Sequence, residues 1–143
     1  MKAEIVSPRR ENLLGSLADM DAVVLFAARE AKLEKFKQEN NFLYLTGIEA
    51  PNAIYFGYKT AKTNVEYLFI QRSDPEREVW EGKKLSKEEA ATESGITRTH
   101  YLDEFEAILS LYCPSINRIF SNIGVQALDA PLSYAMYRLQ PVK

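Results

Sequence analysis

The chain has 143 residues, of which 46% are hydrophobic and 27% charged, and its formal net charge is −2. This length suits one domain with a single core, and the composition is that of a globular protein, not of a disordered or fibrous one. The slight negative charge argues against a broad nucleic-acid surface, because phosphate binding needs clustered surplus lysine and arginine. We therefore expect one domain over residues 1–143 and no nucleic-acid partner.

Three features of the sequence bear on the compartment. The longest apolar run, residues 22–28, is far too short to cross a bilayer. Residues 1–14 contain no apolar segment before their first charged cluster, so no secretory signal is predicted. The single cysteine, Cys113, cannot form an internal disulfide and fits a reducing compartment. We expect a cytoplasmic protein without a membrane partner, and we interpret Cys113 as a core or boundary thiol.

The first third of the chain predicts a helix and then a buried strand. Ser7 and Pro8 provide an N-cap and first-turn signal, and an apolar stripe at helical spacing carries the helix to about Asp19. Residues 22–28, AVVLFAA, form a continuous apolar run that is typical of a strand covered on both faces. This run should be central in a sheet with helices on both sides. Residues 29–40 indicate either a short helix or a structured loop.

Further strands are predicted at residues 42–45, 53–58 and 65–71, with turn-forming stretches between them that imply antiparallel neighbours. Ser86 and Glu89 form a capping box for a helix over 87–94, which Gly95 can close. The remaining elements follow in chain order: a short strand over 99–102, a helix that Asp103 caps and Pro114 ends, a strand over 116–122, and a last helical pattern that begins at 129–131.

These elements predict an α/β fold, a single three-layer domain with a mixed, mostly six-stranded sheet flanked by helices. The side chains that we expect to be mostly buried are Val23, Val24, Leu25, Phe42, Tyr44, Ile54, Phe56, Leu68 and Phe69.

The sequence offers no pattern for catalysis or metal binding. A catalytic metal needs three or more converging ligands, and the chain has one histidine and one cysteine. His100 has no second histidine at helical or strand spacing, so we expect it on the surface or on an edge strand. No glycine-rich phosphate loop and no serine elbow occurs. Neighbouring acids are interpreted as solvated: Asp19 with Asp21, Glu88 with Glu89, and Glu104 with Glu106. We expect no catalytic residue, metal or cofactor site in this chain.

One stretch is unusual, because over half of residues 71–89 are charged and a single tryptophan, Trp80, lies among them. Asp74 and Pro75 favour a turn, and Gly82 permits a backbone conformation closed to other residues, so Trp80 is expected on a loop. Composition alone leaves two interpretations open. The indole either packs its body on the sheet or forms an exposed aromatic wall for a ligand or partner.

Four segments between residues 9 and 111 match sequence motifs, which are more specific than composition. Arg9-Arg10 opens the first helix, ahead of the apolar strand. Residues 36–47, FKQENNFLYLTG, are similar to the pattern [FY]-R-Q-x-S-[DN]-F-x-Y-[LF]-[TS]-G, and Pro51 and Ala53 follow as in an acidic-Pro turn before the next strand. Residues 74–84, DPEREVWEGKK, are similar to D-P-x-x-E-x-W-x-G-x-R and are the most specific of the four.

In this order, the segments resemble the N-terminal domain that precedes the catalytic domain in aminopeptidase P, prolidase and creatinase, with the bacterial aminopeptidase P branch nearest. The W-x-G-x-[KR] segment disfavours a creatinase-type amidinohydrolase. The chain departs from the family pattern at Lys37, Asn40 and Lys84, which replace Arg, Ser and Arg. Lysine lacks the planar fork of arginine, so no bidentate carboxylate contact is assumed there.

The resemblance implies the non-catalytic N-terminal domain of an Xaa-Pro aminopeptidase, a metallopeptidase that removes the N-terminal residue before proline. Its two divalent ions, of manganese, would lie in a C-terminal catalytic domain that this chain lacks. The implied partners are that catalytic domain, further copies in a homo-oligomer, and Xaa-Pro peptides. The domain would contribute oligomer contacts and the substrate entrance, which Trp80 would line. The alternative is a free-standing binding module with this fold and no catalytic partner.

Overall fold

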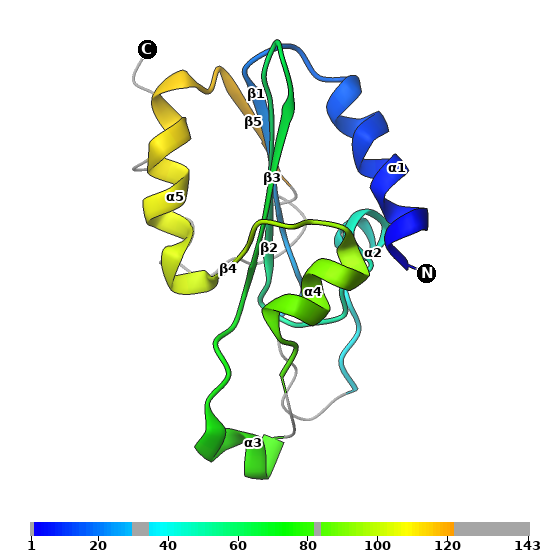
Figure 1. Cartoon of the computed structure of the whole chain (residues 1–143), viewed down its shortest axis with the longest axis vertical. Helices are drawn as coiled ribbons and strands as arrows, with labels where there is room; N and C mark the ends of the chain where they lie inside the picture. The colour runs from blue at the N-terminus through cyan, green and yellow to red at the C-terminus, as the bar shows by residue number, and fades with distance from the viewer. Residues whose placement is uncertain (1, 30–34, 82–83, 122–143) are drawn as a thin grey trace.

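The structure is a computed structural model that describes residues 2–29, 35–81 and 84–121. A mixed sheet runs through its middle in the order β4-β3-β2-β1-β5 (Figure 1). The three inner strands pair antiparallel, and the two short edge strands add in parallel. Their bounds are β1 (Asp21–Phe26), β2 (Ile54–Lys59), β3 (Asn64–Ile70), β4 (Thr99–Tyr101) and β5 (Arg118–Ser121).

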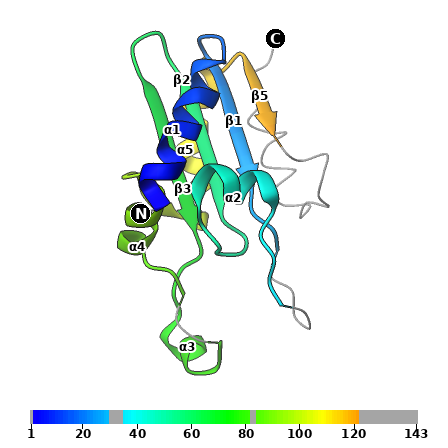
Figure 2. The same cartoon turned by 90° about the vertical axis from the view of Figure 1, so that its right-hand side faces the viewer.

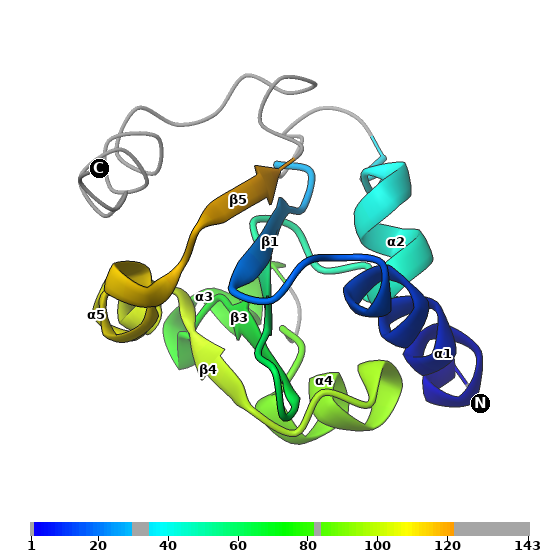
Figure 3. The same cartoon turned by 90° about the horizontal axis from the view of Figure 1, so that it is seen from above.

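Helices cover both faces of the sheet, which confirms the predicted three-layer α/β domain (Figures 1 and 3). One face carries α1 (Lys2–Gly15), α2 (Asn40–Thr46) and α4 (Lys87–Ser94), and the other carries α5 (Phe105–Tyr112). Single 3-10 turns, η1 (Leu102–Glu104) and η2 (Cys113–Ser115), flank α5. A further helix, α3 (Pro75–Glu81), projects beyond the end of the sheet (Figure 2). The last helical pattern of the sequence, from 129, lies outside the described residues.

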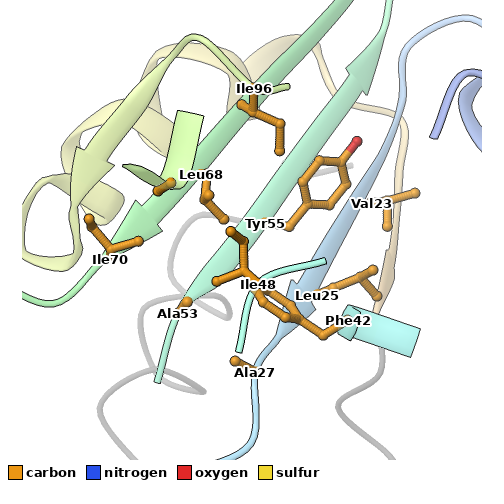
Figure 4. Close-up of a cluster of buried hydrophobic side chains, with 11 residues drawn as sticks. Val23, Leu25, Ala27, Phe42, Ile48, Ala53, Tyr55, Leu68, Ile70 and Ile96 are labelled. Atoms are coloured by element: carbon orange, nitrogen blue, oxygen red, sulfur yellow. The ribbon is translucent and has the colours of Figure 1, made fainter. Parts of the chain in front are cut away.

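Strand β1 explains the continuous apolar run in the sequence. Ala22, Val24 and Phe26 enter the core layer under α5, whereas Val23 and Leu25 enter the layer under α1, α2 and α4. Figure 4 shows the second layer, in which side chains from three strands gather with Phe42 and Ile48. The prediction of an interior strand covered on both faces is confirmed, although β2 rather than β1 holds the middle of the sheet.

The predicted strand at residues 42–45 is wrong, because this segment forms helix α2. Glu39 caps the helix with its carboxylate, which accepts hydrogen bonds from the backbone N–H groups of Asn41 and Phe42 at 3.1 and 2.7 Å. Gly47, at φ 70°, closes the helix in the left-handed conformation that glycine tolerates best. The described sheet therefore has five strands rather than six.

Helical spacing also explains why Tyr44 is the one predicted core residue that is not buried. Phe42 and Thr46, four positions apart, face the core, and this leaves the side chain of Tyr44 56% exposed. The other predicted core residues are all buried. Tyr44 instead lies under the guanidinium of Arg9, whose Cζ is 4.1 Å from the ring centroid.

Helix α1 begins at Lys2, before the predicted start at Pro8, and ends at Gly15 rather than at Asp19. The buried stripe of this helix consists of Val6, Arg10 and Leu14, so its core-facing side extends one turn ahead of the proline. Helix α4 and its capping box agree with the prediction, with Ser86 and Glu89 bonding to each other's backbone N–H groups.

Gln38 gives a structural role to the segment at residues 36–47. Its side-chain oxygen accepts hydrogen bonds from the N–H groups of Ala28 and Glu39, at 2.8 and 2.9 Å. Its amide nitrogen donates to the carbonyls of Ile48 and Ala50, at 3.0 and 2.9 Å. The buried amide thus ties the chain after β1 to the chain after α2, and residues 35–39 form a loop.

A buried guanidinium organises the face under α1. Arg10 is only 1% exposed, and its Nε donates to Glu66 Oε2 at 2.7 Å while its Nη1 donates to the carbonyl of Leu45 at 2.9 Å. The buried Tyr55 hydroxyl donates to the same Glu66 oxygen at 2.8 Å. Burial, and then the negative charge of Glu66, raises the pKa of Tyr55 well above 10.0, so the phenol remains a donor.

Asp21 corrects the interpretation of the acidic pairs as solvated. Its carboxylate is 1% exposed and accepts two hydrogen bonds from Arg118, 2.7 Å from Nη2 and 3.2 Å from Nε. Asp21 and Arg118 face each other at the start of the parallel β1–β5 pair, so the contact fixes this edge. Hydrogen bonding from Arg118 holds the pKa of Asp21 below 3.8, against desolvation, which raises it.

Arg10→Ala should lower the free energy of unfolding by about 3 kcal/mol, because Glu66 loses its buried cationic partner. Urea denaturation measures the change. Arg9→Ala is the matched control, because it removes another guanidinium from α1, one that contacts the exposed Tyr44. This variant should lower the free energy of unfolding by less than about 1 kcal/mol. Equal losses for the two variants would contradict the structural role assigned to Arg10.

The lowered pKa of Asp21 predicts a pH-dependent contribution to stability. The ionised form is favoured in the folded state, so the contribution is fully present above the ordinary pKa of 3.8 and is lost as pH falls through the lower folded-state value. The difference in unfolding free energy between wild type and Asp21→Asn should therefore be constant at neutral pH and shrink below 3.8. A pH-independent effect of Asp21→Asn would refute the assignment.

Candidate functional site

The candidate site is an arm that leaves the sheet after β3 and returns to α4 (Figures 1 and 2). We define the arm as residues 71–81 and 84–86, with an outgoing leg at 71–74, helix α3 at its tip, and a return leg at 84–86. Both views place α3 beyond the end of the sheet. The arm coincides with the charged stretch that the sequence singles out.

The tip of the arm is a helix and not the predicted loop. Asp74 begins it, since its Oδ1 accepts the N–H of Glu76 at 3.0 Å and its carbonyl accepts the N–H of Glu78 at 2.9 Å. Pro75 suits a first helical turn, and the acids that follow it complement the positive end of the helix dipole. The Asp-Pro pair, read in the sequence as a turn, thus starts a helix.

Trp80 lies near the end of α3, and its side chain is outside the described part of the structure. Gly82 is outside the described residues as well. The expected exposure of Trp80 therefore stays a prediction. Its neighbour Val79 is 79% exposed, which shows an apolar side chain presented to solvent on this helix.

A cavity of about 240 Å³ opens where the return leg meets the body of the domain. Its wall combines an aromatic ring with both signs of charge. The lining residues are Ser73, Glu78, Lys84, Leu85, Ser86, Lys87, Glu88 and Tyr101.

Tyr101 is the aromatic part of this wall, and two cations lie over its ring. Arg72 Cζ and Lys87 Nζ are each 4.2 Å from the ring centroid. At this distance a cation is attracted by the negative face of the ring. The cations come from the outgoing leg and from the first residue of α4, so the ring joins the start of the arm to the helix to which the arm returns.

Arg72 also forms an ion pair with Asp103 that uses two nitrogens. Its Nη2 donates to Asp103 Oδ1 at 3.2 Å, and its Nε donates to Oδ2. This hydrogen bonding lowers the pKa of Asp103 and raises that of Arg72. Both side chains are more than half exposed, so salt screens their attraction.

The three departures from the family pattern lie on the surface or at the arm base. Lys84 Nζ is 3.4 Å from Gln71 Oε1, a contact that joins the return leg to the outgoing leg through an amide. Lys37 and Asn40 are exposed.

His100 and Cys113 lie where the sequence places them. His100 is on the edge strand β4, with its Nδ1 3.6 Å from Glu104 Oε1. Cys113 is buried, and burial raises the pKa of its thiol above 9.0, as expected of an unreactive core thiol. Within residues 2–29, 35–81 and 84–121, no three His, Cys, Asp or Glu side chains could hold a metal ion together. No helix in that part of the chain is long and apolar enough to cross a membrane.

Comparison with known proteins gives a consistent result. A family model described as the aminopeptidase P N-terminal domain matches residues 6–120. The Xaa-Pro aminopeptidase of Haemophilus influenzae is 26% identical over 117 residues, which cover 78% of this chain and 27% of that protein. Xaa-Pro aminopeptidase 3 of Mus musculus is 36% identical over 78 residues, or 52% of this chain and 15% of that protein.

Among solved structures, a Bacillus anthracis protein assigned as an aminopeptidase P superposes on 100% of this chain with a TM-score of 0.82 and 31% sequence identity. The aligned region is 38% of that protein. The chain therefore spans well under half the length of the relatives that it matches.

Trp80 is the only tryptophan, so its fluorescence reports on the arm alone. We expect the emission maximum of a solvent-exposed indole and ready quenching by acrylamide, because α3 projects away from the sheet. Trp80→Ala should change the free energy of unfolding by less than about 0.5 kcal/mol, as for most surface positions. The buried control Phe42→Ala should cost about 3–5 kcal/mol. Blue-shifted emission that resists quenching would show that the indole packs on the domain.

Proposed function

The chain belongs to the aminopeptidase P N-terminal domain family, and from this premise we propose that it is the non-catalytic domain of an Xaa-Pro aminopeptidase. In this proposal a C-terminal catalytic domain removes the N-terminal residue that precedes proline. The observation that carries the proposal is the family match over residues 6–120, within a chain that covers only 27% of its Haemophilus relative.

The substrate entrance is the role that we propose for the arm. Its position beyond the sheet leaves helix α3 available to another surface, and Val79 shows that this helix presents an apolar side chain to solvent. An indole beside it can pack against the apolar ring of proline, while its N–H remains free for a polar partner. Trp80 is therefore the residue that we assign to line the entrance for Xaa-Pro peptides.

The metal chemistry belongs, in this proposal, to the catalytic domain. Two divalent ions, which we propose to be manganese, would supply a metal-activated hydroxide there. The donor set of the described residues does not fit such a centre, since no three potential ligands converge in 2–29, 35–81 and 84–121. The domain would also provide oligomer contacts within a cytoplasmic homo-oligomer, where the arm could reach a neighbouring copy.

The kinetic test is Trp80→Ala in the intact enzyme that contains this domain. We expect kcat/KM for an Xaa-Pro peptide to fall by about 1–2 kcal/mol in transition-state free energy, roughly 5- to 30-fold, as for an interface hot spot. Leu111→Ala is the matched control, because it removes an exposed apolar side chain from α5, which lies beside the sheet and away from α3. This variant should leave kcat/KM unchanged.

Two outcomes would contradict the proposal. The first is an unchanged kcat/KM in a folded Trp80→Ala enzyme, which would remove Trp80 from the entrance. The second is stoichiometric manganese or zinc bound to the isolated chain after dialysis, together with cleavage of an Xaa-Pro peptide by that chain. This result would place the catalytic centre in the domain itself.

A further inference from the structure

We infer that Tyr101 is the positioning residue of the arm: its ring holds Arg72 of the outgoing leg beside Lys87, the first residue of α4, to which the return leg leads. The centroid distances are 4.2 Å for Arg72 Cζ and 4.2 Å for Lys87 Nζ. We call these three side chains the clamp. The positioning role stands on the geometry alone, and only its consequence for peptide cleavage rests on the proposed function.

Tyr101 suits this role because it is fixed to the body of the domain. It ends β4 and pairs with Ile70, the last residue of β3 before the outgoing leg. Its N–H donates to Glu104 Oε2 at 2.8 Å, and its ring packs beside the core layer under α1, α2 and α4. The ring therefore stands directly beside the point at which the arm leaves the sheet.

Two carboxylates allow both cations to share one ring. Asp103 pairs with the guanidinium of Arg72, and the charge of Lys87 also acts on Glu104, where it contributes to a lowered pKa. The backbone N–H of Tyr101 is the main cause of that lowering. The negative charges of Asp103 and Glu104, two and three positions after Tyr101, offset the repulsion between the two cations.

The return leg is tied to the domain by Ser86, which caps α4 in the box with Glu89, whereas among the described side chains the outgoing leg and α3 have few such contacts. Leu85 is the one described arm residue that packs against the core layer, while Arg72, Ser73, Asp74 and Val79 are exposed. A segment with few buried apolar contacts opens at low free-energy cost, so weak polar contacts decide where it lies. The clamp is the contact that holds the outgoing leg, through Arg72, beside the start of α4.

The test compares Tyr101→Leu with Tyr101→Phe in the 143-residue chain. Leucine removes the aromatic face, whereas phenylalanine keeps it and loses only the hydroxyl. We expect amide hydrogen exchange in 71–81 to become roughly tenfold faster in Tyr101→Leu, from the loss of the cation–π contacts at the ring. The fluorescence anisotropy of Trp80 should fall in the same variant. Tyr101→Phe should restore both values to near those of wild type.

A second pair of variants covers the case in which Tyr101→Leu unfolds. The double variant Arg72→Gln/Lys87→Gln removes both cations from the surface and should give the same faster exchange. Lys62→Gln, in the exposed turn between β2 and β3, is its control and should have no effect. Because the clamp is electrostatic, 1 M NaCl should mobilise the arm of wild type and leave the double variant almost unchanged.

Unchanged exchange and anisotropy in folded Tyr101→Leu, or in the double variant, would overturn the inference. Kinetics in the intact enzyme separate it from the proposed function. If Tyr101→Leu mobilises the arm and kcat/KM stays constant, the clamp holds and the entrance role of Trp80 fails. If kcat/KM falls while the arm remains immobile, the clamp is wrong.

Discussion

The buried guanidinium of Arg10 is the contact on which one whole face of the sheet depends. A charged group is tolerated in an interior only when its donors are paired, and here Glu66, the Leu45 carbonyl and Ser7 Oγ accept them. These partners come from β3, α2 and α1 itself. Gly57 completes the arrangement, since a Cβ there would lie 2.5 Å from the Tyr55 hydroxyl that also bonds Glu66. The network therefore ties α1 and α2 to β2 and β3.

The sequence predicted the parts of the fold that are set by local patterns. A run of apolar residues at 22–28 indicated a strand buried on both faces, and the Ser86–Glu89 capping box placed α4 to the residue. The strand prediction at 42–45 failed because a run of four apolar residues is too short to distinguish a strand from one helical turn. The deciding contact, the Glu39 carboxylate that caps α2, was not visible in that apolar run. Asp21 escaped prediction because its partner, Arg118, is distant in sequence.

In the candidate site, too, the sequence predicted the local features and missed the contacts between distant residues. The charged stretch and the D-P-x-x-E-x-W pattern located the arm, because both are continuous in the sequence. Tyr101 and the two cations over its ring were missed, since they meet only after β4 pairs with β3 and brings Tyr101 beside Ile70. No composition or spacing signal marks a tyrosine whose importance comes from partners on other elements. To predict such a site, one must first know the register of the sheet.

Core and arm thus differ in the physics that holds them. The core is fixed by close packing and by paired buried groups such as Arg10 and Gln38, whose geometry has few alternatives. The arm is held by exposed charge contacts at Tyr101 and Asp103, each weak and open to screening. A domain built in this way has a rigid core and an arm whose position depends on ionic strength. That combination suits a surface that must meet another chain or a peptide without reorganising the fold beneath it.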